Sequence, residues 1–192
     1  AIYESEPARS GWSEILFLAE RLAPEPSLIP EDPGERAAMF GFLHEIAGEQ
    51  GLGWCRRLML LEPVMRMPSE PPNALRERVA RMAQPYGYSH AAAAAAPRRI
   101  AAILRLLAGQ LASQRGQGRA YLVGPRLSAL DLYWAAFAGM LDPLPHALCP
   151  MPAFLREQYS VKPPLVAEAL DPELLAHRDR IYRDHLELPM QF

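Results

Sequence analysis

Apolar residues recur at helical spacing along most of the chain, and proline and glycine divide the pattern into segments. Residues 12–22 carry an apolar stripe with a helical period, and a proline-rich stretch follows at 23–35. A second helical pattern covers 35–60, where we expect three glycines to bend or interrupt the helix: Gly48, Gly51 and Gly53. The prolines of 62–72 predict a loop, and residues 74–83 predict a short helix.

The second half of the chain carries the clearest helical signals. Residues 91–114 predict an amphipathic helix, because five apolar residues follow the i, i+3, i+4, i+7 pattern: Ile100, Ile103, Leu104, Leu107 and Leu111. Residues 128–141 are apolar all round, which is typical of a helix buried inside a bundle. We expect a loop at 142–152, a short helix at 153–159 and a last helix with Asp171 as its N-cap. Only residues 1–3 have the pattern of a strand end, so the chain is predicted to be all-α.

Asp131 is the single carboxylate in the apolar run YLVGPRLSALDLYWAAF, residues 121–137. It is either a catalytic acid in an apolar pocket or part of a helix cap. Ser128 and Asp131 have the capping-box spacing, and Leu127 and Leu132 occupy the positions of a hydrophobic staple. A helix that starts in a dry interior needs such a cap for its first N–H groups, so the structural interpretation is favoured.

Composition narrows the function classes. A net charge of −2 does not fit a protein whose main task is to bind nucleic acid. Two distant cysteines, Cys55 and Cys149, form no disulfide framework and favour a reducing cytoplasm. No apolar run is long enough for a transmembrane helix, and the first residues lack the basic start of a signal peptide. Abundant arginine beside the single lysine, Lys162, is typical of a GC-rich bacterial genome.

The remaining candidates for chemistry are isolated. The five histidines show no metal-ligand spacing, and no Cys/His cluster occurs, so no metal site is expected. His177 and His185 stand among charged residues and predict the solvated face of the last helix. Cys55 lies beside Trp54 and two arginines that favour a thiolate, but it has no paired base, which makes it a weak candidate nucleophile.

Several of these features together resemble the glutathione transferase superfamily. Tyr121-Leu122-Val123-Gly124, followed by Leu127, Ser128, Asp131 and Tyr133, is similar to the signature of its C-terminal helical domain, and SLIPEDPGERAAMF at 27–40 is similar to its interdomain linker and first helix. The resemblance implies three parts: a remnant of the thioredoxin-like glutathione-binding domain at 1–23, a linker at 24–34 and an all-α C-terminal domain at 35–192. The family's catalytic Ser, Cys or Tyr and its cis-proline would then lie upstream of Ala1, and residues 1–192 alone should be inactive.

The resemblance also implies a glutathione site and a substrate cleft. The family holds the γ-glutamyl end of glutathione with an acid–serine pair, for which Glu4-Ser5 has the right residues and Ser13 the better distance to the linker. The alternative is that Ser10 or Ser13 simply caps the helix at 12–22. The wall of a cleft for an electrophilic substrate has five candidates, for which core packing or surface exposure is the alternative: Phe40, Phe42, His44, Trp54 and Tyr88.

The implied function is conjugation of glutathione, as a substrate, to a small electrophilic apolar molecule by a cytoplasmic, bacterial, homodimeric enzyme. Helical domains of this family also serve as assembly modules attached to other proteins, which gives a non-catalytic alternative in which the chain binds a partner protein. A helical bundle unrelated to the family is the third interpretation. No catalytic residue is assigned within the chain itself.

Overall fold

The computed structural model describes residues 1–70 and 72–190; Pro71, in the predicted loop, and residues 191–192, the end of the predicted helical domain, lie outside them. Helices and the loops between them account for the whole of this described part, in which no strand occurs. The predicted all-α class is therefore confirmed. In chain order the elements are α1 (Trp12–Leu22), α2 (Pro33–Ala47), α3 (Leu52–Met65), α4 (Ala74–Ala83), η1 (Gln84–Tyr86), α5 (His90–Gly116), α6 (Ala129–Ala138), α7 (Ala153–Ser160), α8 (Pro164–Ala169) and α9 (Pro172–His185).

Side-chain caps set the starts of several helices. The carboxylate of Asp32 accepts from the backbone N–H of Glu35 at 2.8 Å, and the carboxylate of Asp171 accepts from that of Glu173 at 2.7 Å. Each of these caps is followed by a proline in the first helical turn, where the missing N–H costs nothing. The predicted N-cap Asp171 is thus confirmed. Asn73 and Ser89 cap α4 and α5 in the same way.

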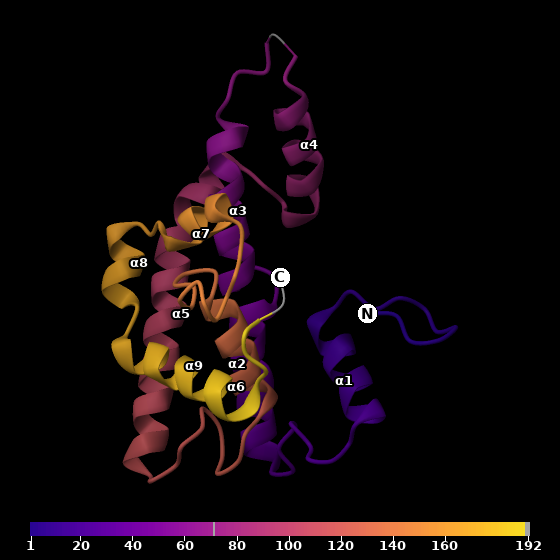
Figure 1. Cartoon of the computed structure of the whole chain (residues 1–192), viewed down its shortest axis with the longest axis vertical. Coiled ribbons are helices and arrows are strands. Elements are labelled where there is room, and N and C mark those ends of the chain that lie inside the picture. Colours follow the sequence, from indigo (N-terminus) through magenta and orange to yellow (C-terminus); the bar gives the residue numbers. More distant parts are fainter. Residues whose placement is uncertain (71, 191–192) are drawn as a thin grey trace.

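The long helix α5 and the short helix α6 form the middle of the bundle. Helix α3 packs along α5, α2 and α9 pack on α6, and α8 covers part of α5. Figure 1 shows α1 beside this bundle, joined to it by the linker, and the α3–α4 hairpin projecting beyond the other helices. Trp134 of α6 is fully buried, and its indole N–H donates to the carbonyl oxygen of Leu174 in α9 at 3.0 Å.

Some sequence predictions need correction. The break at Gly48–Gly51 is confirmed, but the predicted loop at 62–72 is wrong for its first residues, because α3 continues through Pro63 to Met65. Residues 1–3 form no strand: Ala1 makes one mutual pair of backbone hydrogen bonds with Arg9, at 2.7 and 2.8 Å, and a ladder does not continue from it. Helix α8 was not predicted.

Candidate functional site

Asp131 lies in a fully buried hydrogen-bond cluster at the start of α6. One carboxylate oxygen, Oδ2, accepts from the backbone N–H of Ser128 at 3.0 Å and from its hydroxyl at 2.9 Å. The other, Oδ1, accepts from the backbone N–H of Leu122 at 2.9 Å and lies 2.8 Å from Nε2 of His177. The predicted capping box is confirmed. Because both oxygens are occupied and the side chain has no exposed surface, Asp131 is a structural residue.

His177 makes the fourth contact to Asp131, and the prediction that it lies on a solvated face is wrong: only 1% of the residue is exposed. Its Nδ1 lies 3.2 Å from the guanidinium of Arg180. A guanidinium only donates, so Nδ1 is the acceptor, and the ring proton is on Nε2, which donates to Asp131. Arg180 also donates to the carbonyl of Ala120 and lies over the ring of Tyr121, 4.9 Å from its centroid. These contacts fasten the loop before α6 to α9. His185, in contrast, is exposed as predicted.

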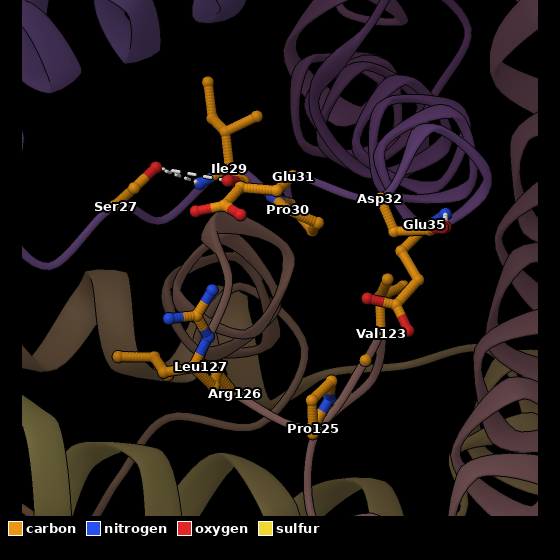
Figure 2. Close-up of a pocket in the computed structure, with 11 residues that line it drawn as sticks. Ser27, Ile29, Pro30, Glu31, Asp32, Glu35, Val123, Pro125, Arg126 and Leu127 are labelled. Atoms are coloured by element: carbon orange, nitrogen blue, oxygen red, sulfur yellow. Dashed lines mark hydrogen bonds between the residues drawn. The ribbon is translucent and has the colours of Figure 1, made fainter.

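A small hollow separates the linker from the turn that precedes α6 (Figure 2). Its volume is about 200 Å³, and Glu31 and Arg126 line its opposite walls. Beside it, Glu35 pairs with Arg119 at 2.9 Å and passes so close to Gly124 that a Cβ there would lie 2.5 Å from its carboxylate. The carbonyl of Leu28 accepts the backbone N–H of Ala129 at 2.9 Å, so the linker itself satisfies one of the first N–H groups of α6.

Helix α1 docks on the bundle through an aromatic cluster made by Trp12, Phe17, Phe40 and Tyr133. The ring of Trp12 lies 6.1 Å from that of Phe40 and 6.2 Å from that of Tyr133, and the rings of Phe17 and Phe40 stack at 5.6 Å. The hydroxyl of Tyr133 donates to the carbonyl of Trp12 at 3.0 Å, and burial raises the pKa of that hydroxyl. Phe40, a predicted wall of the substrate cleft, therefore lies beneath α1.

Trp54 lines an aromatic cleft between α3, η1 and α5. The cleft has a volume of about 480 Å³, and the rings of Trp54 and Tyr86 meet edge to face at 4.9 Å. Arg99 also lines the cleft, and its guanidinium donates a hydrogen bond to the carboxylate of Glu45 at 2.6 Å. The lining is completed by small and apolar residues and a few polar ones: Glu49, Gln50, Cys55, Leu58, Gly87, Ala92, Ala95 and Ala96. Size and lining are those of a small-molecule site, within the range of about 300–1,000 Å³.

Cys55, the weak candidate nucleophile, is buried in this cleft wall. Its Sγ lies 3.4 Å from the carbonyl oxygen of Gln50, which accepts from the thiol. Burial raises the pKa of the Cys55 thiol, against the smaller opposing effect of Arg99. A protonated, buried thiol is a poor nucleophile, so the structure gives no support to a catalytic role for Cys55.

The other candidates for the substrate cleft lie apart from Trp54. Phe42 packs against the main core, and His44 is exposed on α2. Tyr88 belongs to the small apolar cluster between α3 and α4. None of them lines the cleft of Trp54. The five candidates therefore form no single wall: they are divided among the α1 contact, the main core, the surface of α2, the Trp54 cleft and the α3–α4 hairpin.

Tyr88 makes polar contacts with Glu62 and His90 that accompany a raised pKa of its hydroxyl. Its hydroxyl donates to the carboxylate of Glu62 and lies 2.9 Å from Nδ1 of His90. Desolvation and the hydrogen bond to Glu62 raise the pKa of Tyr88 from 10 to about 12.

We expect the absorbance titration of the chain to lose one tyrosine with a pKa near 12 when Tyr88 is replaced by phenylalanine. Because the folded pKa lies above the unfolded one, the stability that Tyr88 contributes is complete below pH 10 and is lost as the pH rises through about 12. Glu62→Gln should lower the pKa of Tyr88, and Tyr3→Phe serves as the control. A titration of the Tyr88→Phe variant that matches the wild type would contradict the assignment.

The predicted glutathione-binding residues lie near the chain's first helix. Ser13 is half-buried in the first turn of α1, whereas Glu4 and Ser5 are exposed in a turn where Glu4 has a φ of 48°. The N-cap of α1 is Gly11, whose N–H donates to the carboxylate of Glu14 at 3.1 Å, so neither Ser10 nor Ser13 is the cap. No hydrogen bond in the described residues joins Ser13 to Glu4 or Ser5, and their roles stay predictions.

Comparison of the chain with family models, with curated proteins and with solved structures finds no match. Within residues 1–70 and 72–190, no three side chains of His, Cys, Asp or Glu come together as a set of metal ligands. The helices of this same part include none with the length and apolar character needed to cross a membrane.

Proposed function

We propose that this chain forms the helical, substrate-binding part of a bacterial glutathione transferase-like protein, which joins glutathione to an electrophilic apolar molecule. The junction of linker and α6 carries the proposal. There the segments on which the resemblance rests meet: the carbonyl of Leu28 accepts from the backbone N–H of Ala129, and Ser128 and Asp131 form the capping box. A linker that helps to cap the central helix is suited to couple a preceding domain to the bundle.

In this proposal the Trp54 cleft holds the electrophile. Its aromatic and alanine walls bury an apolar ring, and Arg99 at the cleft favours substrates with a substituent whose oxygens carry partial negative charge, such as a nitro group. The glutathione thiolate attacks the electrophilic carbon and the leaving group departs with the bonding electrons. The thiolate would be supplied and stabilised by a thioredoxin-like segment. Ser13 would hold the γ-glutamyl end of glutathione.

The cleft is tested by tryptophan fluorescence during titration with a nitroaromatic electrophile. We expect saturable quenching that is lost in Trp54→Phe and kept in Trp12→Phe, because only Trp54 lines the cleft. The glutathione part is tested separately by calorimetry, where we expect binding that Ser13→Ala weakens. Quenching that persists in Trp54→Phe would contradict the cleft, and glutathione binding unaffected by Ser13→Ala would contradict the assignment of Ser13.

The alternative, an assembly module, is favoured by one observation on α1. Phe17 and Leu22 of this helix each expose 47% of their surface, and apolar surface on this helix suits a protein partner or a second copy of the chain. The same experiments discriminate the two functions, because an assembly module requires neither a saturable aromatic cleft nor affinity for glutathione.

A further inference from the structure

A second open groove lies between α3 and the segment that joins α7 to α8. Its volume is about 490 Å³, and it is separate from the Trp54 cleft, with which it shares no lining residue. Apolar side chains of both segments form most of its walls: Met59, Leu60, Pro63, Val64, Val161 and Pro163. Figure 1 shows α3 and α7 beside one another at this end of the bundle. The proposed function gives this groove no role.

Arg56 is the unusual residue of this groove, because it is a buried charge with no acidic partner. Only 3% of the residue is exposed. Its Nε donates to the carbonyl of Met140 at 2.9 Å, and its Nη2 donates to backbone carbonyls at the end of α7, including those of Gln158 at 2.7 Å and Val161 at 3.0 Å. Within residues 1–70 and 72–190, its guanidinium forms no ion pair. Carbonyl dipoles solvate the charge but do not neutralise it.

The third guanidinium nitrogen of Arg56 has no hydrogen-bond partner among the described residues. Its Nε and Nη2 make all of the hydrogen bonds of the side chain, which leaves Nη1 as the atom that a ligand in the groove could meet. Burial lowers the pKa of Arg56, which is the effect expected of a guanidinium that lacks an anion. A carboxylate placed at Nη1 would neutralise the buried charge with a charge-assisted hydrogen bond.

Lys162 supplies a second cation to the same groove. It is largely buried, and its Nζ donates to the carbonyl of Leu141 at 2.9 Å and lies 3.5 Å from Asp142, which also pairs with Arg178. The acidic residue in the lining is Glu157, which is exposed on α7. The groove therefore combines apolar walls with a net positive charge.

We propose that this groove binds an aliphatic monocarboxylate of medium chain length, with the carboxylate at Nη1 of Arg56 and Nζ of Lys162 and the alkyl chain along Met59, Leu60 and Val64. Each part of the groove matches one part of such a ligand. One uncompensated guanidinium calls for one negative charge, whereas a phosphate dianion would need further donors that apolar walls do not provide. The alkyl chain removes apolar surface of both ligand and groove from water.

The test is calorimetric titration of the whole chain with octanoate and with its neutral isostere, octanamide. We expect saturable 1:1 binding of octanoate and at least about tenfold weaker binding of octanamide, because the amide cannot neutralise Arg56. Octylamine should not bind, since its ammonium would meet two cations. Equal affinity for octanoate and octanamide, or no saturable heat with octanoate, would overturn the proposal.

Substitutions at the edge of the groove test where the ligand binds and leave the fold intact. Arg56 itself is not a suitable target, because its loss would free several buried carbonyls and destabilise the chain. Val161 lines the groove and is 65% exposed, so Val161→Glu should fold normally and abolish octanoate binding by charge repulsion. Lys162→Gln should weaken binding several-fold, while Arg105→Gln, an exposed position outside the groove, should leave it unchanged. Octanoate binding that survives Val161→Glu at full affinity would place the ligand elsewhere and refute the assignment.

Discussion

Replacing Asp131 with alanine is expected to lower the free energy of unfolding by about 3–5 kcal/mol, the cost typical of removing one partner from a buried, hydrogen-bonded charge cluster. Four donors lose their acceptor at once: the N–H and O–H of Ser128, the N–H of Leu122 and Nε2 of His177. None of these donors can form a replacement hydrogen bond with water, because the cluster is buried. Domains of this kind are stable by about 5–15 kcal/mol, so much of the total would be lost.

Urea unfolding followed by circular dichroism measures this effect. Ser128→Ala should cost only about 1–2 kcal/mol, because Asp131 would still accept from Leu122 and His177. Asp184→Ala is the matched control: this aspartate pairs with Arg183 on the surface, where ion pairs contribute little. If Asp131→Ala unfolded at the same urea concentration as Asp184→Ala, the cluster would not hold α6 in place.

The sequence predicts the caps and helix boundaries well because these depend on nearby residues. Ser128 and Asp131 are three residues apart, and Asp171 acts on the next turn, so the signal and its effect lie in one short segment. Helices α1 and α4 have the predicted bounds for the same reason: proline, glycine and asparagine at their ends act locally. The class all-α follows from these local signals.

The contact between Asp131 and His177 was harder to predict because the two residues are distant in sequence. His177 is 46 residues away, and its charged neighbours suggested a solvated helix face. A usable signal was present, however. Five positions of α9 that are buried in the structure follow the pattern i, i+3, i+4, i+7, i+8: Leu174, His177, Arg178, Ile181 and Tyr182. This helical spacing by itself predicts that His177 and Arg178 face the interior of the bundle.

The continuation of α3 past Pro63 was missed because tertiary packing outweighs a local preference. Proline costs a helix an N–H bond, which argues for a loop. In the structure, Leu61, Val64 and Met65 pack against α4 and Tyr88, and this apolar contact keeps the last turn helical. Tertiary packing also explains why the candidates for the substrate cleft lie on different faces. The sequence shows that such a residue is apolar, but it does not show which helix will cover it.

Gly53→Ala is expected to destabilise the chain by about 1–3 kcal/mol, although alanine is the better helix former. The added Cβ would lie 2.2 Å from Cε1 of Phe137, so the ring must move. That ring stacks on Tyr133 at 6.3 Å, and Tyr133 in turn holds the carbonyl of Trp12. Displacing Phe137 therefore disturbs the contact between α1 and the bundle as well as the packing of α3 on α6.

A double-mutant cycle with Phe137→Ala separates the clash from the helix propensity. In the Phe137→Ala background the clashing ring is gone and the nearest remaining atom, the carbonyl oxygen of Ile46, lies at an ordinary contact distance of 3.5 Å, so we expect the cost of Gly53→Ala to disappear and the gain in propensity to remain. Gly109→Ala is the matched control within a helix, because no atom lies within 4 Å of its added Cβ; it should stabilise the chain by about 0.4–1 kcal/mol. If Gly53→Ala stabilised the wild type as much as Gly109→Ala does, the close approach of α3 to Phe137 would not set the packing of these helices. Unfolding free energies of the four chains of the cycle decide between the two outcomes, and the fluorescence of Trp12 reports whether α1 moves with the ring.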